Sequence, residues 1–528
     1  MSKEPPQSND EWFAKGTCND LDTIAGELAA CQAEHDQPVA EPTPTESSGD
    51  ESDEPDEPRT KLADALVLCA HEYNHFFHDL SRDCYAQHSG TGATLRLGGV
   101  EFRDWLVSTF YEKNQRSPNS VAVKQAVDTL SAQARFHGEQ REVFVRTAFV
   151  QGAYYVDLGQ IGNRKAVCIM PGKWEVTEAH RVAFVRNSAM QPLPEPVRGG
   201  SLNQLWALVN IPAEDQPLVE AWLIDAMRID SPYPLLELIG EQGSAKSTTQ
   251  EFLRKLIDPN SCNLRAIPTT RVDIFVSANA SGIVSYENVS QLTAEFQDAL
   301  CTLATGGGFA KRKLYTDFDE SVLTVKRPIM INGISAAVTA QDLVSRTISI
   351  ELPTITKRIE SGSIAQIFVA DWPAILGALF DLFAGALAAL PSVTIPSGDS
   401  PRLIEYARLG MAIAQAQGRD PMSFYTLFKR NCTDSVHRTL DASPVATAVL
   451  DWFAATRFSS TELAVGELLG SLERYKPQGC DAWPKSAHAL GNQLLRQAPA
   501  LRQAGVLVHS LGKRGRHVLW SFKKAQGS

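Results

Sequence analysis

The chain lacks a cysteine framework and a leader-like apolar run. Its nine cysteines are scattered through 528 residues and form no C-x-x-C pair. An odd number without regular spacing predicts a reducing compartment rather than a disulfide-stabilised secreted protein. The first 30 residues also lack the apolar stretch of a signal peptide. We therefore expect a cytoplasmic protein.

Long uncharged apolar runs are also missing. The stretch nearest to a membrane span is 372–390, which Asp381 interrupts and which Asp371 and Pro373 open. A spanning helix needs about 20 predominantly apolar residues without such charges, so a buried helix is favoured here. We expect no membrane partner.

The chain has a formal net charge of −11, but the excess of acidic residues is confined to its first 60 residues. Residues 1–60 contain 16 Asp and Glu and 3 Lys and Arg, which leaves the rest of the chain near +2. The acidity therefore does not argue against a nucleic-acid partner. Residues 37–57 consist largely of Pro, Glu, Asp, Ser and Thr, which cannot bury enough apolar surface to fold. We expect residues 1–60 to be a disordered acidic tail.

Residues 61–200 predict an N-terminal α/β domain. A proline- and glycine-containing stretch at 192–200 marks its end. The apolar patterns predict helices at 62–73, around 102–110 and around 123–130, a hairpin at 76–86, and strands at 143–149, 153–158, 165–169 and 174–176.

The same region contains a literal H-E-x-x-H at 71–75. On a helix, His71 and His75 would face one way and could bind zinc, with Glu72 as the base. The pattern is short, however, and the hairpin that begins at Phe76 leaves little room for the helix. We favour a polar helix end and keep a zinc protease as a remote alternative. Candidate third ligands are His78, Cys84 and His88.

The strongest motif lies within residues 233–258. An apolar run at 235–239 predicts a buried strand, a glycine-bearing loop follows, and an amphipathic helix ends at Asp258. These are the parts of a P-loop, whose backbone N–H groups cradle phosphate oxygens at the positive end of a helix. Lys246 is expected to reach the β- and γ-phosphates and Ser247 to ligate Mg²⁺. The predicted nucleotide-binding residues are Gly240, Glu241, Gln242, Gly243, Ser244, Ala245, Lys246, Ser247 and Thr248.

One position departs from the G-x-x-x-x-G-K-[ST] pattern. Ala245 stands where the last glycine is expected, and we expect its methyl group to fit with a negative φ. The loop resembles the Gly-Asp-Pro-x-x-Ala-Lys-Ser loop of the minichromosome-maintenance helicases, which also has Ala before Lys.

Two strands after the loop end in polar residues. The run at 283–288 contains Glu287, a Walker B candidate that would hold Mg²⁺ or activate the attacking water. Asn332 ends the run at 328–333 and is a candidate for positioning that water. A helix is expected at 213–227 and a strand at 271–278.

Arg346 precedes a further apolar strand at 348–350. It could be an arginine finger that reaches the nucleotide of a neighbouring subunit, or a surface salt-bridge residue.

The segment 306–325 predicts a β-hairpin with basic arms. Lys311, Arg312 and Lys313 are candidate DNA contacts, although a solvated edge hairpin explains them equally well. The expected tip at 317–320 is acidic.

The last two regions differ in character. Residues 356–440 predict a helical bundle, whereas residues 441–528 carry more Lys and Arg than Asp and Glu. Helices expected at 444–456, 460–473 and 485–504, followed by a basic hairpin, are the layout of a winged helix. Lys513, Arg514 and Arg516 in its turn are candidate phosphate contacts. A winged helix that binds protein is the alternative.

Several segments taken in order resemble the superfamily III (AAA+-related) helicase ATPases of phages, plasmids and integrated elements, near the poxvirus-type primase–helicase branch. The resemblance implies an α/β fold, with a P-loop AAA+ (ASCE) core at 201–355 between the N-terminal α/β domain and the C-terminal winged-helix domain. It also implies ATP and Mg²⁺ as cofactors. Lys246, Ser247 and Glu287 would then serve the nucleotide and metal, with Asn332 as sensor 1 and Arg346 as the finger. The segments are GEQGSAKST (240–248), IVSYEN (283–288), GGGFAKRKLYTDFDE (306–320), RPIMINGI (327–334) and DLVSRTISIEL (342–352).

From this resemblance we predict an ATP-dependent, helicase-like DNA motor of a phage or mobile element. It would act in DNA replication as a hexameric ring on single-stranded or forked DNA, and the acidic tail would be a candidate site for another replication protein. The alternative is a DNA-binding P-loop switch ATPase with a regulatory or defence role and no unwinding. The chain departs from the family in having one Walker B acid and an acidic hairpin tip.

Overall fold

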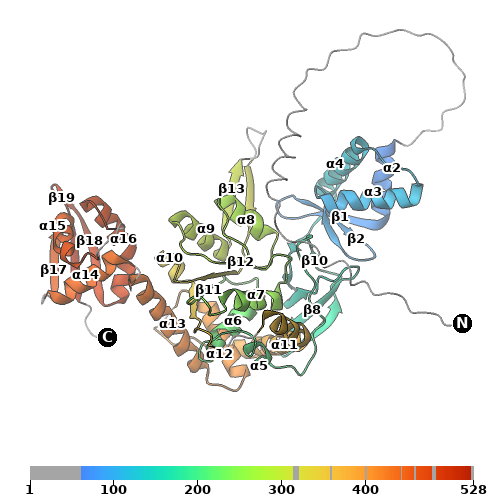
Figure 1. Ribbon diagram of the computed structural model, residues 1–528. Helices are drawn as coiled ribbons and strands as arrows, with labels where there is room; N and C mark the ends of the chain where they lie inside the picture. The colour runs from blue at the N-terminus through green and yellow to red at the C-terminus, as the bar shows by residue number, and fades with distance from the viewer. Residues whose placement is uncertain are drawn as a thin grey trace, which may run out of the picture. The chain divides into compact units, whose positions relative to one another are not determined.

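A computed structural model describes residues 61–312, 320–356, 360–398, 401–441, 443–456, 459–477 and 483–524 (Figure 1). The tail 1–60, Lys313 and the hairpin tip at 317–319 lie outside the described residues, so the predictions made for them stay predictions. Side chains at 309–312 and 320–323 are also outside the description.

The first part of the described chain packs three helices with a small sheet whose strand order is β3-β2-β1-β4. The predicted helix at 62–73 and the hairpin after it are confirmed. The elements are α2 (Leu62–Tyr73), β1 (Asn74–His78), β2 (Cys84–His88), β3 (Thr94–Arg96), α3 (Val100–Asn114), α4 (Ser120–Phe136) and β4 (Glu139–Gln140).

The geometry of this part removes the basis for a zinc protease. Helix α2 ends at Tyr73 because Asn74 has extended backbone, so His71 lies on a helix and His75 on strand β1. The His71 ring bonds Gln133 at 2.8 Å, and Glu72 pairs with Lys113. The two imidazoles therefore do not share a helix face, and no group of three metal-binding side chains occurs among the described residues.

A second sheet follows, with strand order β6-β7-β8-β9, beside the short pair β10-β5. The strand predicted at 143–149 is wrong as one unit, because Arg146 has a left-handed backbone (φ 65°) and breaks it in two. The elements are β5 (Val143–Phe144), β6 (Thr147–Val150), β7 (Ala153–Asp157), β8 (Lys165–Met170), β9 (Lys173–Glu178) and β10 (Ala183–Phe184).

The break at Arg146 turns its side chain into the interior, where it is 1% exposed. Its Nε lies 3.1 Å from Asp258 Oδ1, and its Nη1 and Nη2 donate to the carbonyls of Asp157 and Gln191 at 3.0 and 2.6 Å. The other Asp258 oxygen accepts from the N–H of Ile283 at 2.8 Å. One buried ion pair thus joins the second sheet to the P-loop core.

We expect Arg146→Met to destabilise the chain strongly. The variant would leave the buried Asp258 carboxylate with Arg254, 3.9 Å away, as its remaining cation. Removing one partner of a buried ion pair typically costs about 3–5 kcal/mol. Lys165→Met is the matched control, because Lys165 pairs with Glu195 at the surface and such pairs contribute about 0–1 kcal/mol. Chemical denaturation of both variants measures the difference, and equal losses would contradict the prediction.

The core is a four-stranded parallel sheet of order β12-β15-β11-β16. Its central strands are almost wholly buried, which explains their continuous apolar sequence. In a parallel sheet all carboxyl ends meet at one edge, and a ligand crevice is expected there. The strands are β11 (Leu235–Ile239), β12 (Val284–Tyr286), β15 (Ile329–Gly333) and β16 (Thr347–Glu351), and the helices are α5 (Asn203–Trp206), α6 (Gln216–Asp225), α7 (Lys246–Ile257), α8 (Arg271–Asn279), α9 (Ala294–Thr305) and α10 (Gln341–Val344).

The strand predicted at 271–278 is wrong, because these residues form helix α8. Thr270 caps the helix by accepting from the N–H of Asp273 at 3.3 Å. Ile274, Phe275 and Ala278 then lie on one buried face.

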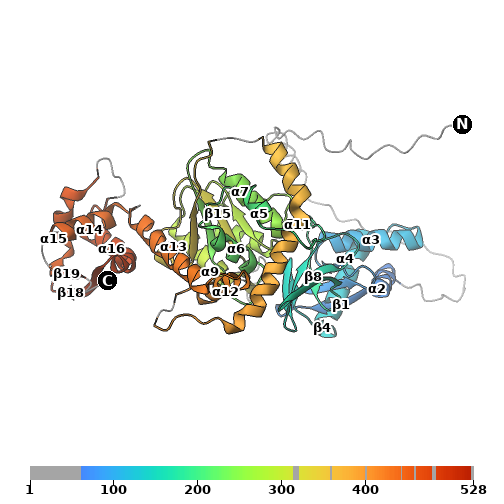
Figure 2. The ribbon, with the colours of Figure 1, turned by 90° about the horizontal axis from the view of Figure 1, so that it is seen from below.

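Helix α11 (Ser361–Ala389) contains the apolar run at 372–390. Residues 362–392 are long and apolar enough to cross a membrane, and their most apolar 18 residues have a mean hydropathy of 1.9. Figure 2 shows α11 between strand β8 and the P-loop core, and it contacts β8, β9 and α7. Asp381 accepts from Trp174 Nε1 at 2.7 Å and pairs with Arg198 at 3.1 Å. The prediction of a buried helix is confirmed for this stretch by its packing.

Further helices complete the middle of the chain and lead into the C-terminal part. They are η2 (Leu390–Ser392), α12 (Ile404–Ala416) and α13 (Pro421–Asp441).

The described residues of the C-terminal part form three α-helices, one short 3-10 helix and an antiparallel sheet of order β17-β19-β18. The helix predicted at 460–473 is wrong at its start, because Ser460–Ala464 alternate in exposure and pair with β19 as a strand. The elements are α14 (Pro444–Ala455), β17 (Ser460–Ala464), α15 (Val465–Leu472), η3 (Glu473–Tyr475), α16 (Ala487–Gln503), β18 (Val506–Arg514) and β19 (His517–Lys524).

Candidate nucleotide-binding site

The loop between β11 and α7 has a backbone that requires glycine at two positions. A Cβ on Gly240 would lie 2.7 Å from the Leu352 carbonyl oxygen and from Ser244 Oγ. Gly243 has φ 92°, a conformation that side chains rarely adopt. Ser244 is buried and closes the turn by donating to the Glu241 carbonyl at 2.9 Å. The loop is therefore a tight turn ending at the first residue of α7.

The backbone conformation of Ala245 differs from the one predicted. Its φ is 55°, so the negative φ expected for this residue is wrong. The loop keeps a glycine-type conformation although the residue carries a methyl group. A left-handed non-glycine residue costs roughly 1–2 kcal/mol. Strain of this kind tends to occur at functional sites.

We expect Ala245→Gly to raise the free energy of unfolding by about 0.5–1 kcal/mol. Glycine adopts this φ without strain, and that gain exceeds the entropy it adds to the unfolded chain. Ala132→Gly is the control with the opposite sign, because Ala132 lies exposed within helix α4 and glycine there costs about 1 kcal/mol. Thermal or urea denaturation measures the stability of both variants. A lower free energy of unfolding in both would show that Ala245 is not strained.

Lys246 is the first residue of α7, and its side chain lies over the loop. Its Nζ donates to the carbonyls of Gly240 and Glu241 at 2.7 and 2.8 Å. Partial burial lowers the pKa of this ammonium group. Ser247 follows and is exposed. The N-terminus of α7, a lysine and a serine hydroxyl thus meet at one point, which is a favourable place for an anion.

A cavity of about 800 Å³ adjoins this loop. Gly240 and Glu241 line one side, and helix α13 lines another with Arg430 and Arg438. Arg438 Nη1 is buried and has no hydrogen-bond partner among the described residues. Acidic residues also line the cavity, namely Glu214, Asp215, Glu351 and Asp434. Sequence reasoning missed these arginines, because α13 is almost 200 residues from the loop in sequence.

Asn210 fixes the loop from the same side. Its Nδ2 donates to the carbonyls of Ser244 and Pro353 at 2.9 and 2.6 Å.

Glu287 and Asn332 lie on neighbouring segments. Glu287 is half-buried directly after β12, and Asn332 is buried at the end of β15. Asn332 Oδ1 accepts from the N–H of Asn288 at 2.9 Å, and Asn332 Nδ2 donates to Gln250 Oε1 at 2.6 Å. The structure therefore brings these two predicted residues together and adds Gln250, which sequence reasoning missed.

Arg346 lies at the opposite edge of the sheet, just before β16 begins. Its side chain is 16% exposed, and its Nε is 3.7 Å from Asp342 Oδ2. Asp342 also pairs with Arg402. Because the amino ends of the strands are far from their carboxyl ends, Arg346 is placed away from the phosphate loop of its own chain. Its role as a finger stays a prediction.

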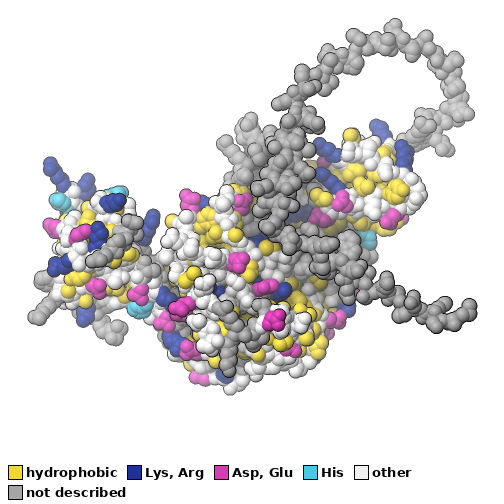
Figure 3. Space-filling view, in the orientation of Figure 1, with side chains coloured by type: hydrophobic (Ala, Val, Ile, Leu, Met, Phe, Trp, Pro, Cys, Tyr) yellow, Lys and Arg dark blue, Asp and Glu magenta, His cyan; other side chains and the backbone are white. Residues whose placement is uncertain are grey.

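The predicted DNA-contacting residues fall into two groups. Lys311 and Arg312 end strand β13 (Gly308–Arg312), which pairs with β14 (Glu320–Thr324) as the predicted hairpin. Lys513, Arg514 and Arg516 are exposed at the β18–β19 turn. Figure 3 shows Lys and Arg side chains on the visible face of this C-terminal part.

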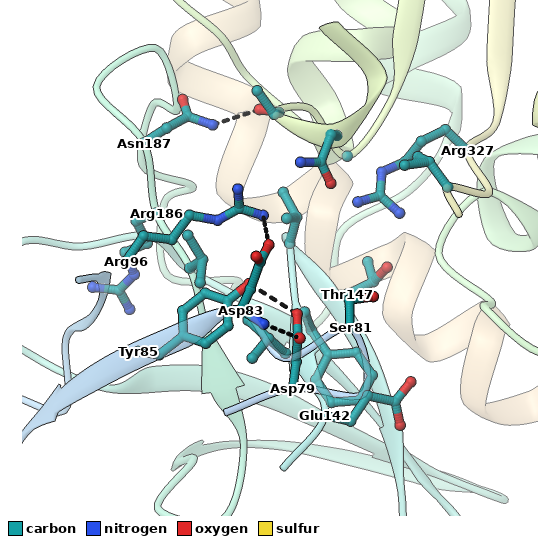
Figure 4. Close-up of a pocket in the computed structure, with 18 of the residues that line it drawn as sticks. Asp79, Ser81, Asp83, Tyr85, Arg96, Glu142, Thr147, Arg186, Asn187 and Arg327 are labelled. Atoms are coloured by element: carbon teal, nitrogen blue, oxygen red, sulfur yellow. Dashed lines mark hydrogen bonds and ion pairs between the residues drawn. The ribbon is translucent and has the colours of Figure 1, made fainter. Parts of the chain in front are cut away.

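A second cavity, of about 630 Å³, lies between β1, β2, β5 and the end of β14 (Figure 4). Acidic and basic side chains are mixed on its wall. Tyr85 donates to Asp79 at 3.1 Å, and Arg327 donates to the carbonyls of Ala278 and Ser281. Because both signs of charge alternate here, this cavity indicates no one class of ligand.

Comparison with known proteins identifies a family. The profile of the actinomycete integrative conjugative element replication protein matches residues 202–435, and the profile of the RepA C-terminal domain from these elements matches residues 445–528. A search of the curated proteins finds no match.

Solved structures with similar chain traces include the active helicase Cch of SCCmec type IV, at 13% identity and a TM-score of 0.44. The match covers 86% of this chain and 93% of that one. The apo A form of the NrS-1 C-terminal region is 10% identical with a TM-score of 0.39, covering 88% of this chain and 99% of that one. TM-scores at this level do not establish a shared fold.

The two family profiles together span more than half of the chain. They confirm the expected origin in a mobile element and the expected role in DNA replication. This chain belongs to the replication protein family of actinomycete integrative conjugative elements.

Proposed function

We propose that this replication protein is a Mg²⁺-dependent ATPase that works as a helicase-like motor on DNA. One observation carries the proposal. A tight glycine loop joins strand β11 to helix α7, and two carbonyls of this loop hold the Lys246 ammonium group over it. Backbone N–H groups, a helix N-terminus and a lysine are the groups that recognise polyphosphates. The adjoining cavity of about 800 Å³ meets the loop at Gly240 and Glu241 and is not lined by Lys246 or Ser247, so the proposal rests on the loop itself.

The donor set fits ATP and Mg²⁺. Ser247 is exposed at the start of α7 and would supply a hydroxyl to the metal. No described residue pairs with the half-buried carboxylate of Glu287, so it could serve Mg²⁺ or the attacking water. Bound Mg²⁺ would neutralise charge on the phosphates. Hydrolysis that rises with single-stranded DNA, together with strand displacement, tests the motor function.

We also propose that residues 441–528 are a winged-helix domain that binds DNA. The order α14, β17, α15, α16, β18, β19 supports this arrangement, as does the exposed basic turn. Contacts from such a turn to phosphates would be independent of DNA sequence and sensitive to salt.

Replacing Lys513, Arg514 and Arg516 with Gln should weaken DNA binding and flatten its salt dependence. Each lost phosphate contact removes about 0.9 from the slope of log affinity against log salt, so the slope should fall by up to about three. Replacing Arg103, Arg116 and Lys124 with Gln is the control, since it removes the same charge from exposed sites elsewhere. Binding titrations at several salt concentrations compare the two. Equal slopes would mean that the turn does not face DNA.

Assembly is part of the same proposal. A hexameric ring would let Arg346 reach the nucleotide of a neighbour, and the acidic tail 1–60 would be free to bind another replication protein. One observation favours the alternative of a switch ATPase without unwinding: Arg346 pairs with Asp342 of its own chain. ATP hydrolysis without strand displacement would select that alternative.

A further inference from the structure

The side chain of Gln250 lies inside the core, four residues beyond Lys246 on helix α7, and is fully buried. Its Nε2 donates to Ser285 Oγ at 2.8 Å and to the Tyr286 carbonyl at 3.0 Å. Its Oε1 accepts from Asn332 Nδ2 at 2.6 Å. One amide thus connects the P-loop helix to strands β12 and β15.

These bonds hold the chain on both sides of Glu287. Before Glu287, the Tyr286 carbonyl is held directly by Gln250. After it, the Asn288 N–H donates to Asn332 Oδ1 at 2.9 Å, and the Val289 N–H donates to the backbone carbonyl of Asn332 at 2.8 Å. Gln250 accepts from the Asn332 side chain in turn. Asn288 has φ 52°, so the backbone leaves the strand through a sharp turn at this point.

A buried amide must be hydrogen-bonded wherever it lies, so satisfied bonds alone would indicate only packing. Here, however, two of the three partners, the Tyr286 carbonyl and the Asn332 amide, hold the backbone on either side of Glu287. We propose that Gln250 is a positioning residue, which sets the Glu287 carboxylate relative to Lys246 and Ser247. This inference rests on the proposed ATPase function.

The same geometry adds a structural role to the one expected for Asn332. Its Oδ1 and Nδ2 are both engaged within the protein, and the residue is 2% exposed. Asn332 would therefore also contribute through the Asn288 N–H that it holds, and its role in positioning the attacking water stays a prediction.

Gln250→Glu tests the proposal with almost no change in volume. The introduced carboxylate still accepts from Asn332 but cannot donate to the Tyr286 carbonyl. We expect kcat to fall by about 10–100-fold, as for other groups that support a metal-site ligand. Affinity for a fluorescent ATP analogue should stay within about threefold, because Lys246 and the loop are unchanged.

The pH dependence gives a readout that a loss of packing would not. Burial raises the pKa of an introduced carboxyl group. Below that pKa the group is protonated and again has a donor for Tyr286. The ratio of kcat in the variant to kcat in wild type should therefore rise as pH falls from about 8.5 to about 6.

Gln297→Glu is the matched control. Gln297 is also buried, at 4% exposure, and donates to the Leu292 carbonyl and to Thr339 Oγ1 at 3.0 Å each. Its partners are Leu292, Thr339 and Ala340, none of which belongs to α7 or to residues 285–289. We expect this control to lower the melting temperature by a similar amount and to keep kcat and its pH profile. Ser285→Ala, which removes one bond of the network, serves if Gln250→Glu does not fold, and should lower kcat less with unchanged affinity.

The outcomes separate the two claims. Suppose that wild type hydrolyses ATP. If Gln250→Glu then keeps a normal kcat, or loses kcat and nucleotide affinity to the same extent as Gln297→Glu, the positioning role is overturned and the ATPase function stands. If wild type shows no turnover, both fall. A selective loss of kcat that low pH partly restores supports both.

Discussion

Lys246→Ala should abolish ATP hydrolysis and leave the chain folded. The Lys246 ammonium bonds only to carbonyls and a hydroxyl of the loop, so its removal costs little packing. The same group is the one positioned to hold the β- and γ-phosphates. Loss of one preorganised donor at a developing charge typically costs about 10²–10³ in kcat, and loss of phosphate binding adds to this. Steady-state turnover and the melting temperature measure the two effects.

Lys255→Ala is the control for this variant. Lys255 lies on the same helix and pairs with Glu251 across one helical turn at 3.2 Å. Its loss removes the same charge without touching the loop, so turnover should stay normal. Glu287→Gln should bind ATP and lose turnover. Normal hydrolysis in Lys246→Ala would remove the central claim about this site.

The P-loop was predictable because its signals are local. A short apolar strand, two glycines in a tight turn, Lys246-Ser247 and an amphipathic helix occupy 23 consecutive residues, and each restricts the backbone on its own. The same is true of helix α2, which ends where the sequence turns to aromatic residues.

The errors at 143–149 and 460–473 share a physical cause, because each segment has a partner that is distant in sequence. Ser460–Ala464 are a strand because β19, some 60 residues later, pairs with them. The strand at 143–149 breaks because Arg146 reaches Asp258, 112 residues away. Gln250 has no motif of its own, and only the meeting of α7 with β12 and β15 gives it significance. Helix α8 is the exception, since its cap at Thr270 was readable in the sequence.

Arg346→Ala should bind ATP almost normally and hydrolyse it poorly. Arg346 lies at the edge of the sheet opposite its own phosphate loop, so it can contact phosphates only on another chain. A finger supplied by a neighbour stabilises charge on the transferred phosphoryl group, and its loss typically costs about 10³–10⁵ in rate. Nucleotide affinity and turnover, measured separately, show whether only the second falls.

Arg402→Ala is the matched control for Arg346. Arg402 pairs with the same carboxylate, Asp342, and its side chain is 45% exposed. Losing it breaks a surface ion pair on Asp342 without removing Arg346, so turnover should change little. If both variants lose activity equally, the loss comes from the ion-pair cluster and not from a finger.

Mixing Arg346→Ala with Lys246→Ala subunits tests whether the finger acts between chains. In a ring, some interfaces would pair the intact phosphate loop of the Arg346 variant with the intact Arg346 of the Lys246 variant. Partial ATPase activity should then return, although neither protein is active alone. The subunits must first be shown to exchange, for example by energy transfer between labels. If exchanged mixtures stay inactive, or if Arg346→Ala is fully active alone, Arg346 is an ion-pair residue of its own chain and not a finger. The switch ATPase then becomes the better account of this replication protein.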